Sequence, residues 1–188
     1  MSAIETIQQR RSAPKLTTPA PSAEHLQAIL AAGLYAPDHG RLKPWKFLTV
    51  EGDARIKLGK LYLKAALAET ADLSQERQQR IKNMPLRAPT VVIAVAQPVE
   101  GHKVPVLEQL IATGAAVQNM LLAAQELNIG AMWRTGEMAY KSVVKAGLGL
   151  QSKDEIIAYL YLGTAVLTAK PREPDAVDQY CVSWTGDD

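Results

Sequence analysis

Apolar residues recur with a helical period near the start of the chain. They predict a short helix from about Ser2 to Gln9, and a second helix with an apolar stripe from Leu26 to Leu34, capped by Ser22. Pro37 ends the second helix, because proline lacks an amide donor and pushes the preceding residue away from helical angles. Residues 14–21, rich in Pro and Thr, have no period and predict an extended connector.

Four further segments are short, apolar and strand-like. Residues 46–50, 130–133 and 156–162 each end at polar or glycine residues, as strands commonly do. The run at residues 90–96 is apolar or β-branched at every position. Such a run is typical of a strand covered on both faces, so we expect it at the centre of a sheet.

Helical periodicity returns between these strands, where residues 54–67, 74–82 and 140–146 predict helices. Residues 106–127 are apolar nearly all round, with Gly114 in the middle, which is typical of a helix packed on several sides. In a modest single domain this pattern indicates a subunit interface. Several helices and four short strands predict one domain, residues 1–188, of the α+β or α/β class.

Charge and cysteine content narrow the class of protein. The net charge of +2, from 21 basic and 19 acidic residues, is too small and too evenly spread to propose a nucleic-acid partner. One cysteine, Cys181, cannot form an internal disulfide, which favours a reducing compartment. No apolar signal core opens the chain, and no run of about 18 uncharged apolar residues is found. We therefore expect a cytoplasmic protein without a membrane span.

Arg10, Arg11 and Ser12 form the first candidate site, at the end of the first predicted helix. Two guanidinium groups and a hydroxyl can hold a phosphate through charge-assisted hydrogen bonds. A solvated basic pair that complements the helix dipole is the alternative interpretation.

The loop from Pro37 to Trp45 is the second candidate, since it contains His39 and Lys43 between two prolines that limit its backbone freedom. In an ordered form it would present several donors to an anionic or planar ligand. It is equally typical of a surface connector that Trp45 anchors to the core.

The third candidate comprises Met132, Trp133, Arg134, Thr135 and Gly136, where a predicted strand ends in a cation, a hydroxyl and a glycine. Ligands in layered folds bind preferentially where strands end, and glycine lets backbone amides approach a ring closely. The alternative is a simple turn from strand to helix.

A fourth candidate follows the last predicted strand, where Lys170 and Arg172 flank a proline in a rigid basic turn. The pair could supply another phosphate contact. A solvated tail is the alternative interpretation.

Several motifs occur in one order along the chain: Arg-Arg-Ser at 10–12, Ala-Pro-Asp-His at 36–39, His-Lys-Val-Pro at 102–105, Trp-Arg-Thr-Gly at 133–136 and Leu-Tyr-Leu-Gly-Thr at 160–164. In this order and spacing, the chain resembles the nitroreductase family over nearly its whole length. It is most similar to the short bacterial members of the YdjA type.

The resemblance implies an α+β homodimer with a central mixed sheet flanked by helices, and two FMN molecules at the subunit interface. Residues from both chains would hold each FMN. Arg10, Arg11 and Ser12 would contact the phosphate and ribityl end of FMN. Tyr35, Pro37 and His39 would approach it from the other subunit. Met132 to Gly136 would lie along the isoalloxazine ring or the phosphate tail, and Lys170 and Arg172 match a basic pair near the end of many family members.

The resemblance also implies an activity, in which FMN takes a hydride from NAD(P)H and then reduces a nitro compound, a quinone or a similar acceptor by a ping-pong mechanism. The flavin carries the chemistry, so no acid–base dyad is expected. Lys43 or Arg134 would stabilise the reduced flavin by its positive charge. The alternative is a flavin-binding or sensing module without turnover.

Overall fold

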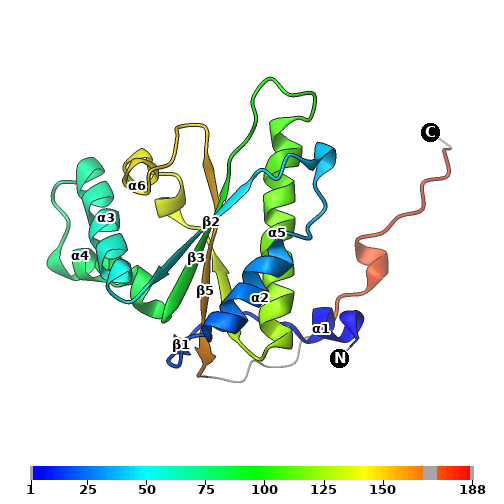
Figure 1. Cartoon of the computed structure of the whole chain (residues 1–188), viewed down its shortest axis with the longest axis horizontal. Helices are drawn as coiled ribbons and strands as arrows, with labels where there is room; N and C mark the ends of the chain where they lie inside the picture. The colour runs from blue at the N-terminus through cyan, green and yellow to red at the C-terminus, as the bar shows by residue number, and fades with distance from the viewer. Residues whose placement is uncertain (1, 167–172, 187–188) are drawn as a thin grey trace.

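An antiparallel sheet forms the middle layer of the protein in a computed structural model that describes residues 2–166 and 173–186 (Figure 1). Its strands are β1 (Leu16–Thr17), β2 (Trp45–Glu51), β3 (Thr90–Ala96), β4 (Gly130–Arg134) and β5 (Glu155–Ala165). They follow the order β1-β5-β3-β2, and β4 pairs with β5.

Every pairing in the described part of the sheet is antiparallel, so the expected mixed sheet is wrong. The reason is the place of β5, which pairs with both β3 and β4 and runs opposite to each. Strands β3 and β4 run in the same direction, but β5 separates them. The α+β assignment, with helices around a sheet, is confirmed.

Strand β3 lies between β2 and β5, and all seven of its residues are buried. Ile93 pairs with Leu48 of β2 on one side and with Tyr159 of β5 on the other. The prediction of a central strand covered on both faces is therefore confirmed.

Helices cover both faces of this sheet (Figure 1). One layer contains α2 (Ala23–Gly33) and α5 (Val106–Glu126), and the other contains α3 (Asp53–Glu69), α4 (Gln75–Lys82) and α6 (Ser142–Gly147). Successive residues of β3 face opposite layers: Val91 and Ile93 pack in the cluster with α3, while Val92 packs with α2 and α5. The period of two along the strand thus builds two separate cores.

Serine side chains begin three of the helices. Ser2, Ser22 and Ser74 each accept a hydrogen bond from the backbone amide three residues later, and Ser2 belongs to a complete capping box that starts α1 (Ala3–Gln9). These hydroxyls satisfy amides that have no partner within the helix. The predicted helix starts at about Ser2, Ser22 and Ser74 are confirmed to within one residue.

Three sequence expectations are wrong in detail. The connector at 14–21 contains β1, which pairs with the end of β5 because β5 continues past β3. Leu34 is exposed rather than part of the buried stripe, since α2 ends one residue earlier. The predicted helix 140–146 starts later, after a 3-10 turn, η3 (Glu137–Ala139).

Helix α5 has the length and composition of a membrane-crossing helix, but it packs against the sheet and α2. Gln109 is buried in it and its side-chain amide donates to the carbonyls of Val99 and Val104. These contacts identify α5 as a core helix of the domain. Its opposite side leaves Leu107 and Ile111 exposed by 66% and 61% in the single chain.

Candidate functional site

A cavity of about 340 Å³ lies where β4 ends, and we refer to it as the aromatic cavity. All five residues of the third predicted site, from Met132 to Gly136, line it. Its other lining residues are Tyr62, Met84, Arg87, Glu137, Met138, Tyr159 and Tyr161. Sequence reasoning thus found one wall of the cavity and missed the others, which come from distant elements.

Three tyrosines form much of this missed wall. The rings of Tyr62 and Tyr159 meet edge to face, with centroids 5.6 Å apart and planes at 73°. Tyr159 donates from its hydroxyl to the carbonyl of Met138 at 3.3 Å, and burial raises the pKa of Tyr62 and of Tyr159. The Tyr62 hydroxyl is buried, and the neighbouring Tyr159 phenol contributes to the rise in its pKa. The three tyrosines therefore give this wall broad ring surface with few polar atoms.

Two guanidinium groups, of Arg87 and Arg134, stand at the same cavity. Burial raises the pKa of Tyr161, and the positive charges of Arg87 and Arg134 oppose that rise. Both cations therefore lie close enough to the Tyr161 phenol to act on it electrostatically. Arg87 carried no sequence signal, because it is a single cation in η2 (Met84–Arg87), just before a buried strand.

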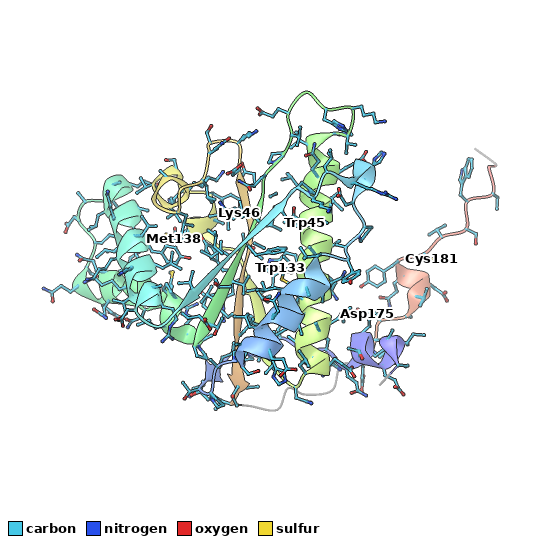
Figure 2. The ribbon with its side chains drawn as sticks, in the orientation of Figure 1. Trp45, Lys46, Trp133, Met138, Asp175 and Cys181 are labelled. Carbon is cyan, nitrogen blue, oxygen red and sulfur yellow. The ribbon has the colours of Figure 1, made fainter. Side chains whose placement is uncertain are left out.

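Gly136 gives the cavity a stretch of open backbone. Its φ of +69° lies in the region that favours glycine, and a Cβ placed there would meet nothing within 4 Å. Backbone amides at this turn are accessible to a planar ligand. The chain passes from one face of the sheet to the other around this turn. In Figure 2, Trp133 packs toward α5, while Met138 lies on the other side of the sheet.

The segment of Arg10, Arg11 and Ser12 lies at the opposite end of β4. Ala13 donates from its amide to the carbonyl of Ala131 at 2.8 Å, which ties the segment to that strand. Arg11 and Ser12 line a second cavity of about 400 Å³ that also touches Gly130, the first residue of β4. Four residues of strand rise by about 13 Å, so this cavity is roughly one strand length from the aromatic cavity.

Arg10 and Arg11 also line a third cavity, beside the C-terminal segment. Asp175 and Cys181 of that segment line the same cavity, and Figure 2 shows Asp175 beside the first helix. The Arg11 guanidinium donates to the carbonyls of Gln8 and Arg10, at 2.6 and 2.9 Å. The basic segment is therefore held between the sheet and the tail.

The loop that follows α2 is displayed on the surface of the chain. Tyr35 is 86% exposed, and Pro37, His39 and Lys43 are exposed as well. Lys43 has a φ of +49° and its amide donates to the Asp38 carboxylate at 2.6 Å. None of these side chains lines the aromatic cavity of its own chain.

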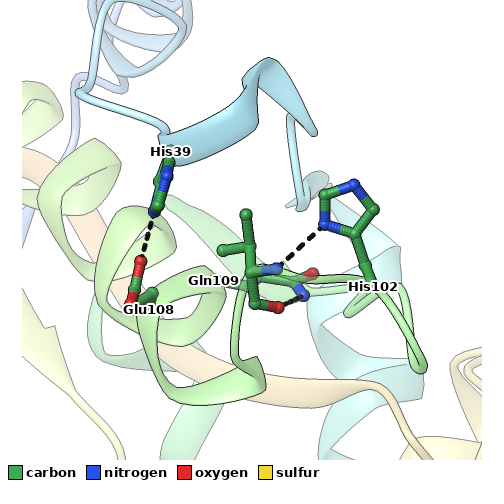
Figure 3. Close-up of polar contacts among 5 residues, drawn as sticks. His39, His102, Glu108 and Gln109 are labelled. Carbon is green, nitrogen blue, oxygen red and sulfur yellow. Dashed lines mark hydrogen bonds and ion pairs between the residues drawn. The ribbon is translucent and has the colours of Figure 1, made fainter.

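Figure 3 shows what holds this loop in place. His39 Nδ1 lies 2.6 Å from Glu108 Oε2 of α5, so the imidazole already has a carboxylate partner. Nearby, His102 Nδ1 accepts from the Val104 amide at 3.1 Å. The side chain of Val104 would lie 3.2 Å from a Cβ at Gly40, so the two loops are in close contact.

Lys170 and Arg172 lie outside the described residues, and their assignment to the phosphate stays a prediction. The other predicted residues fall in three places in one chain: the aromatic cavity, the N-terminal segment and the exposed loop.

Comparison with known proteins gives consistent matches to one family. The model of the "Nitroreductase family" matches residues 7–164. "Putative NAD(P)H nitroreductase YdjA" of Escherichia coli strain K12 is 40% identical over 169 residues, which cover 90% of this chain and 91% of that protein. The predicted likeness to the short YdjA-type proteins is confirmed.

Solved structures agree on the fold. The nitroreductase-like family protein from Bacillus cereus superposes with a TM-score of 0.84 at 22% identity, over 99% of this chain and 97% of that chain. A nitroreductase with bound FMN from Bacteroides fragilis gives 0.72 at 22% identity, over 98% and 99% of the two chains. The expected nitroreductase-like fold is confirmed.

Proposed function

Because this chain belongs to the nitroreductase family, we propose that it is an FMN-dependent oxidoreductase that takes a hydride from NAD(P)H and reduces nitro compounds, quinones or similar acceptors. One observation carries the proposal. All five residues of the predicted strand-end site line a single cavity, beside two cations and three tyrosines. The relative YdjA is named for NAD(P)H, and the B. fragilis structure contains FMN, which supports the same assignment.

The aromatic cavity fits a planar ring with polar edges. Its lining is largely apolar, and specificity would come from a few polar groups, as in most cofactor sites. Arg87 and Arg134 supply polar groups to the lining, and the turn at Gly136 leaves backbone open to close approach. We assign the isoalloxazine ring to this cavity, in contact with residues 132–136.

The phosphate end is assigned to Arg10, Arg11 and Ser12. The segment is tied to the same strand as the ring cavity, which supports one ligand reaching along β4 from one to the other. Arg11 is held by two carbonyl acceptors, so its side chain is ordered before a ligand binds. Lys170 and Arg172 would add positive charge to this end.

A second copy of the chain completes the proposed site. Tyr35, Pro37, His39 and Lys43 are exposed and away from the aromatic cavity of their own chain, so the loop can approach the cofactor of a partner with the contact between His39 and Glu108 in place. The exposed apolar side of α5 supports the same homodimer, because a second copy would bury this apolar surface.

When bound, FMN supplies the redox chemistry, accepting a hydride from NAD(P)H and passing electrons to the acceptor. The protein orients the reactants in the aromatic cavity and excludes water from its tyrosine-lined wall. Arg87 and Arg134 favour negative charge that develops there, and Lys43 of the partner would add to this effect. Donor and acceptor would use the cavity in turn, which gives ping-pong kinetics.

The alternative, a flavin-binding or sensing module, is separated from an enzyme by stopped-flow spectroscopy. We expect NADPH or NADH to bleach the bound flavin within seconds, followed by reoxidation with a quinone. No bleaching over minutes, with flavin that dithionite still reduces, would favour the module without turnover.

The phosphate assignment is tested by Arg10→Ala combined with Ser12→Ala. This variant is expected to lose FMN affinity by about tenfold or more, because charge-assisted hydrogen bonds to the phosphate are removed. Lys57→Ala, an exposed cation on α3, is the control and should retain wild-type affinity. Fluorescence titration measures the Kd, and retention of FMN by the double variant would remove these residues from the site.

A further inference from the structure

A fourth cavity adjoins the aromatic cavity and opens along α4; we refer to it as the basic cavity, after its two arginines, Arg77 and Arg80. It has a volume of about 410 Å³, and its charged lining consists of Glu76, Arg77, Arg80 and Glu137. Met84 and Glu137 line both cavities. A ligand larger than one ring can therefore extend from the aromatic cavity into the basic cavity.

The two arginines share one face of α4. Arg77 and Arg80 are three residues apart, a spacing that places side chains next to each other on a helix. Met84 follows Arg80 by four residues, at the shared wall. With a rise of 1.5 Å per residue, Arg77 and Arg80 lie within roughly 10 Å of that wall along the chain.

The combined walls carry more positive than negative charge. Arg77, Arg80, Arg87 and Arg134 face two carboxylates, those of Glu76 and Glu137. No ion pair or side-chain hydrogen bond within residues 2–166 and 173–186 involves any of these four guanidinium groups. Four long cations at a cavity without carboxylate partners are available to an anionic ligand.

We propose that the basic cavity binds the 2′-phosphate of NADPH through Arg77 and Arg80, so that NADPH rather than NADH is the preferred hydride donor. The inference rests on the proposed function, in which the isoalloxazine ring lies in the aromatic cavity and the hydride donor approaches it there. NADPH differs from NADH by one phosphate at the adenosine end, far from the nicotinamide. The basic cavity runs from the shared wall at Met84 along α4 to Arg80 and Arg77, so it can hold the far end of a dinucleotide whose nicotinamide lies in the aromatic cavity. Paired guanidinium groups bind a phosphate dianion bidentately, whereas a ribose hydroxyl offers them no charge.

The test compares both dinucleotides with the FMN-loaded protein. Stopped-flow reduction of the flavin gives a Kd for each, and the wild type is expected to bind NADPH about tenfold or more tightly than NADH. In the variant Arg77→Gln with Arg80→Gln, the ratio of the two Kd values should fall to near one. Calorimetry with adenosine 2′,5′-bisphosphate gives an independent readout, in which the variant should lose binding that the wild type shows.

Lys57→Gln with Lys60→Gln is the matched control, because it removes the same charge from exposed positions on the neighbouring α3. Its Kd ratio should change by less than about twofold, since neither lysine lines the basic cavity or the aromatic cavity. A wild type without preference for NADPH, or a preference that survives in the arginine variant, overturns the inference while flavin bleaching still upholds the oxidoreductase. Absence of bleaching with either dinucleotide overturns both.

Discussion

Tyr159 and Tyr161 point to the same face of β5, because strand residues two apart share a face. With Tyr62 of α3 they pack in the core cluster on that face and form part of the aromatic cavity. The sequence predicted the strand but assigned no role to its tyrosines. Only the long-range contact between the rings of Tyr62 and Tyr159 makes them a shared wall.

Burial of these phenols predicts a loss of stability at high pH. The pKa values of Tyr62, Tyr159 and Tyr161 are raised, chiefly because burial disfavours the phenolate. The unfolded chain releases these protons above pH of about 10 while the folded chain keeps them. The stabilisation is therefore complete below pH 10, and the free energy of unfolding should fall as pH rises beyond it.

Urea unfolding between pH 8 and 11 measures this slope. Tyr161→Phe is expected to make the slope shallower, because one titrating group is removed. Tyr140→Phe is the matched control, since Tyr140 is exposed, and its slope should equal that of the wild type. A free energy of unfolding that is constant up to pH 11 would contradict the prediction.

At the scale of elements, the sequence predicted the features that depend on neighbouring residues alone. Serine caps located the helix starts, and the β-branched run located the central strand β3. The direction of the sheet and the strand β1 were not predictable in this way. Both depend on β5, which separates β3 from β4 and offers its free end to Leu16 and Thr17.

The contact between α3 and α4 predicts a large effect of Gly59→Ala. A Cβ at Gly59 would lie 2.1 Å from the backbone carbonyl oxygen of Lys82, so one helix must move. Overpacking of this kind costs about 2 kcal/mol or more. Because α4 carries Arg77 and Arg80, the shift should also reduce the preference for NADPH.

Gly114→Ala in α5 is the control for this substitution. Its Cβ would approach only Trp133, at 3.9 Å, which is ordinary contact distance. Alanine is a better helix former than glycine by about 1 kcal/mol. Because Gly114 is three residues after Ile111, the comparison is made at protein concentrations where the chain is monomeric, and there this variant should be as stable as the wild type or more stable. Thermal unfolding compares the two variants, and equal Tm values for them would show that α3 and α4 do not pack as described.

At the scale of the whole molecule, the sequence identified candidate residues from their chemistry but did not predict where each lies in the fold. The strand-end segment forms one cavity, whereas Arg10 to Ser12 lie at the other end of β4 and the loop with His39 is displayed outward. A single sequence contains no signal for which copy of the chain supplies a given side chain. The apolar α5 is the one hint, because its exposed residues leave a face without cover.

Ile111→Lys tests whether a second copy covers that face. Ile111 is 61% exposed in the single chain, so a lysine there should not unfold the monomer. In a twofold dimer the same face meets itself, and both copies would bury an unpaired charge. We expect a monomer by analytical ultracentrifugation and, because each FMN site would lose the partner's loop, an FMN affinity weakened by about tenfold or more.

Ile56→Lys, 47% exposed on α3, is the matched control and should stay dimeric with FMN bound. A monomeric Ile111→Lys that holds FMN with wild-type affinity would place the whole cofactor site within one chain.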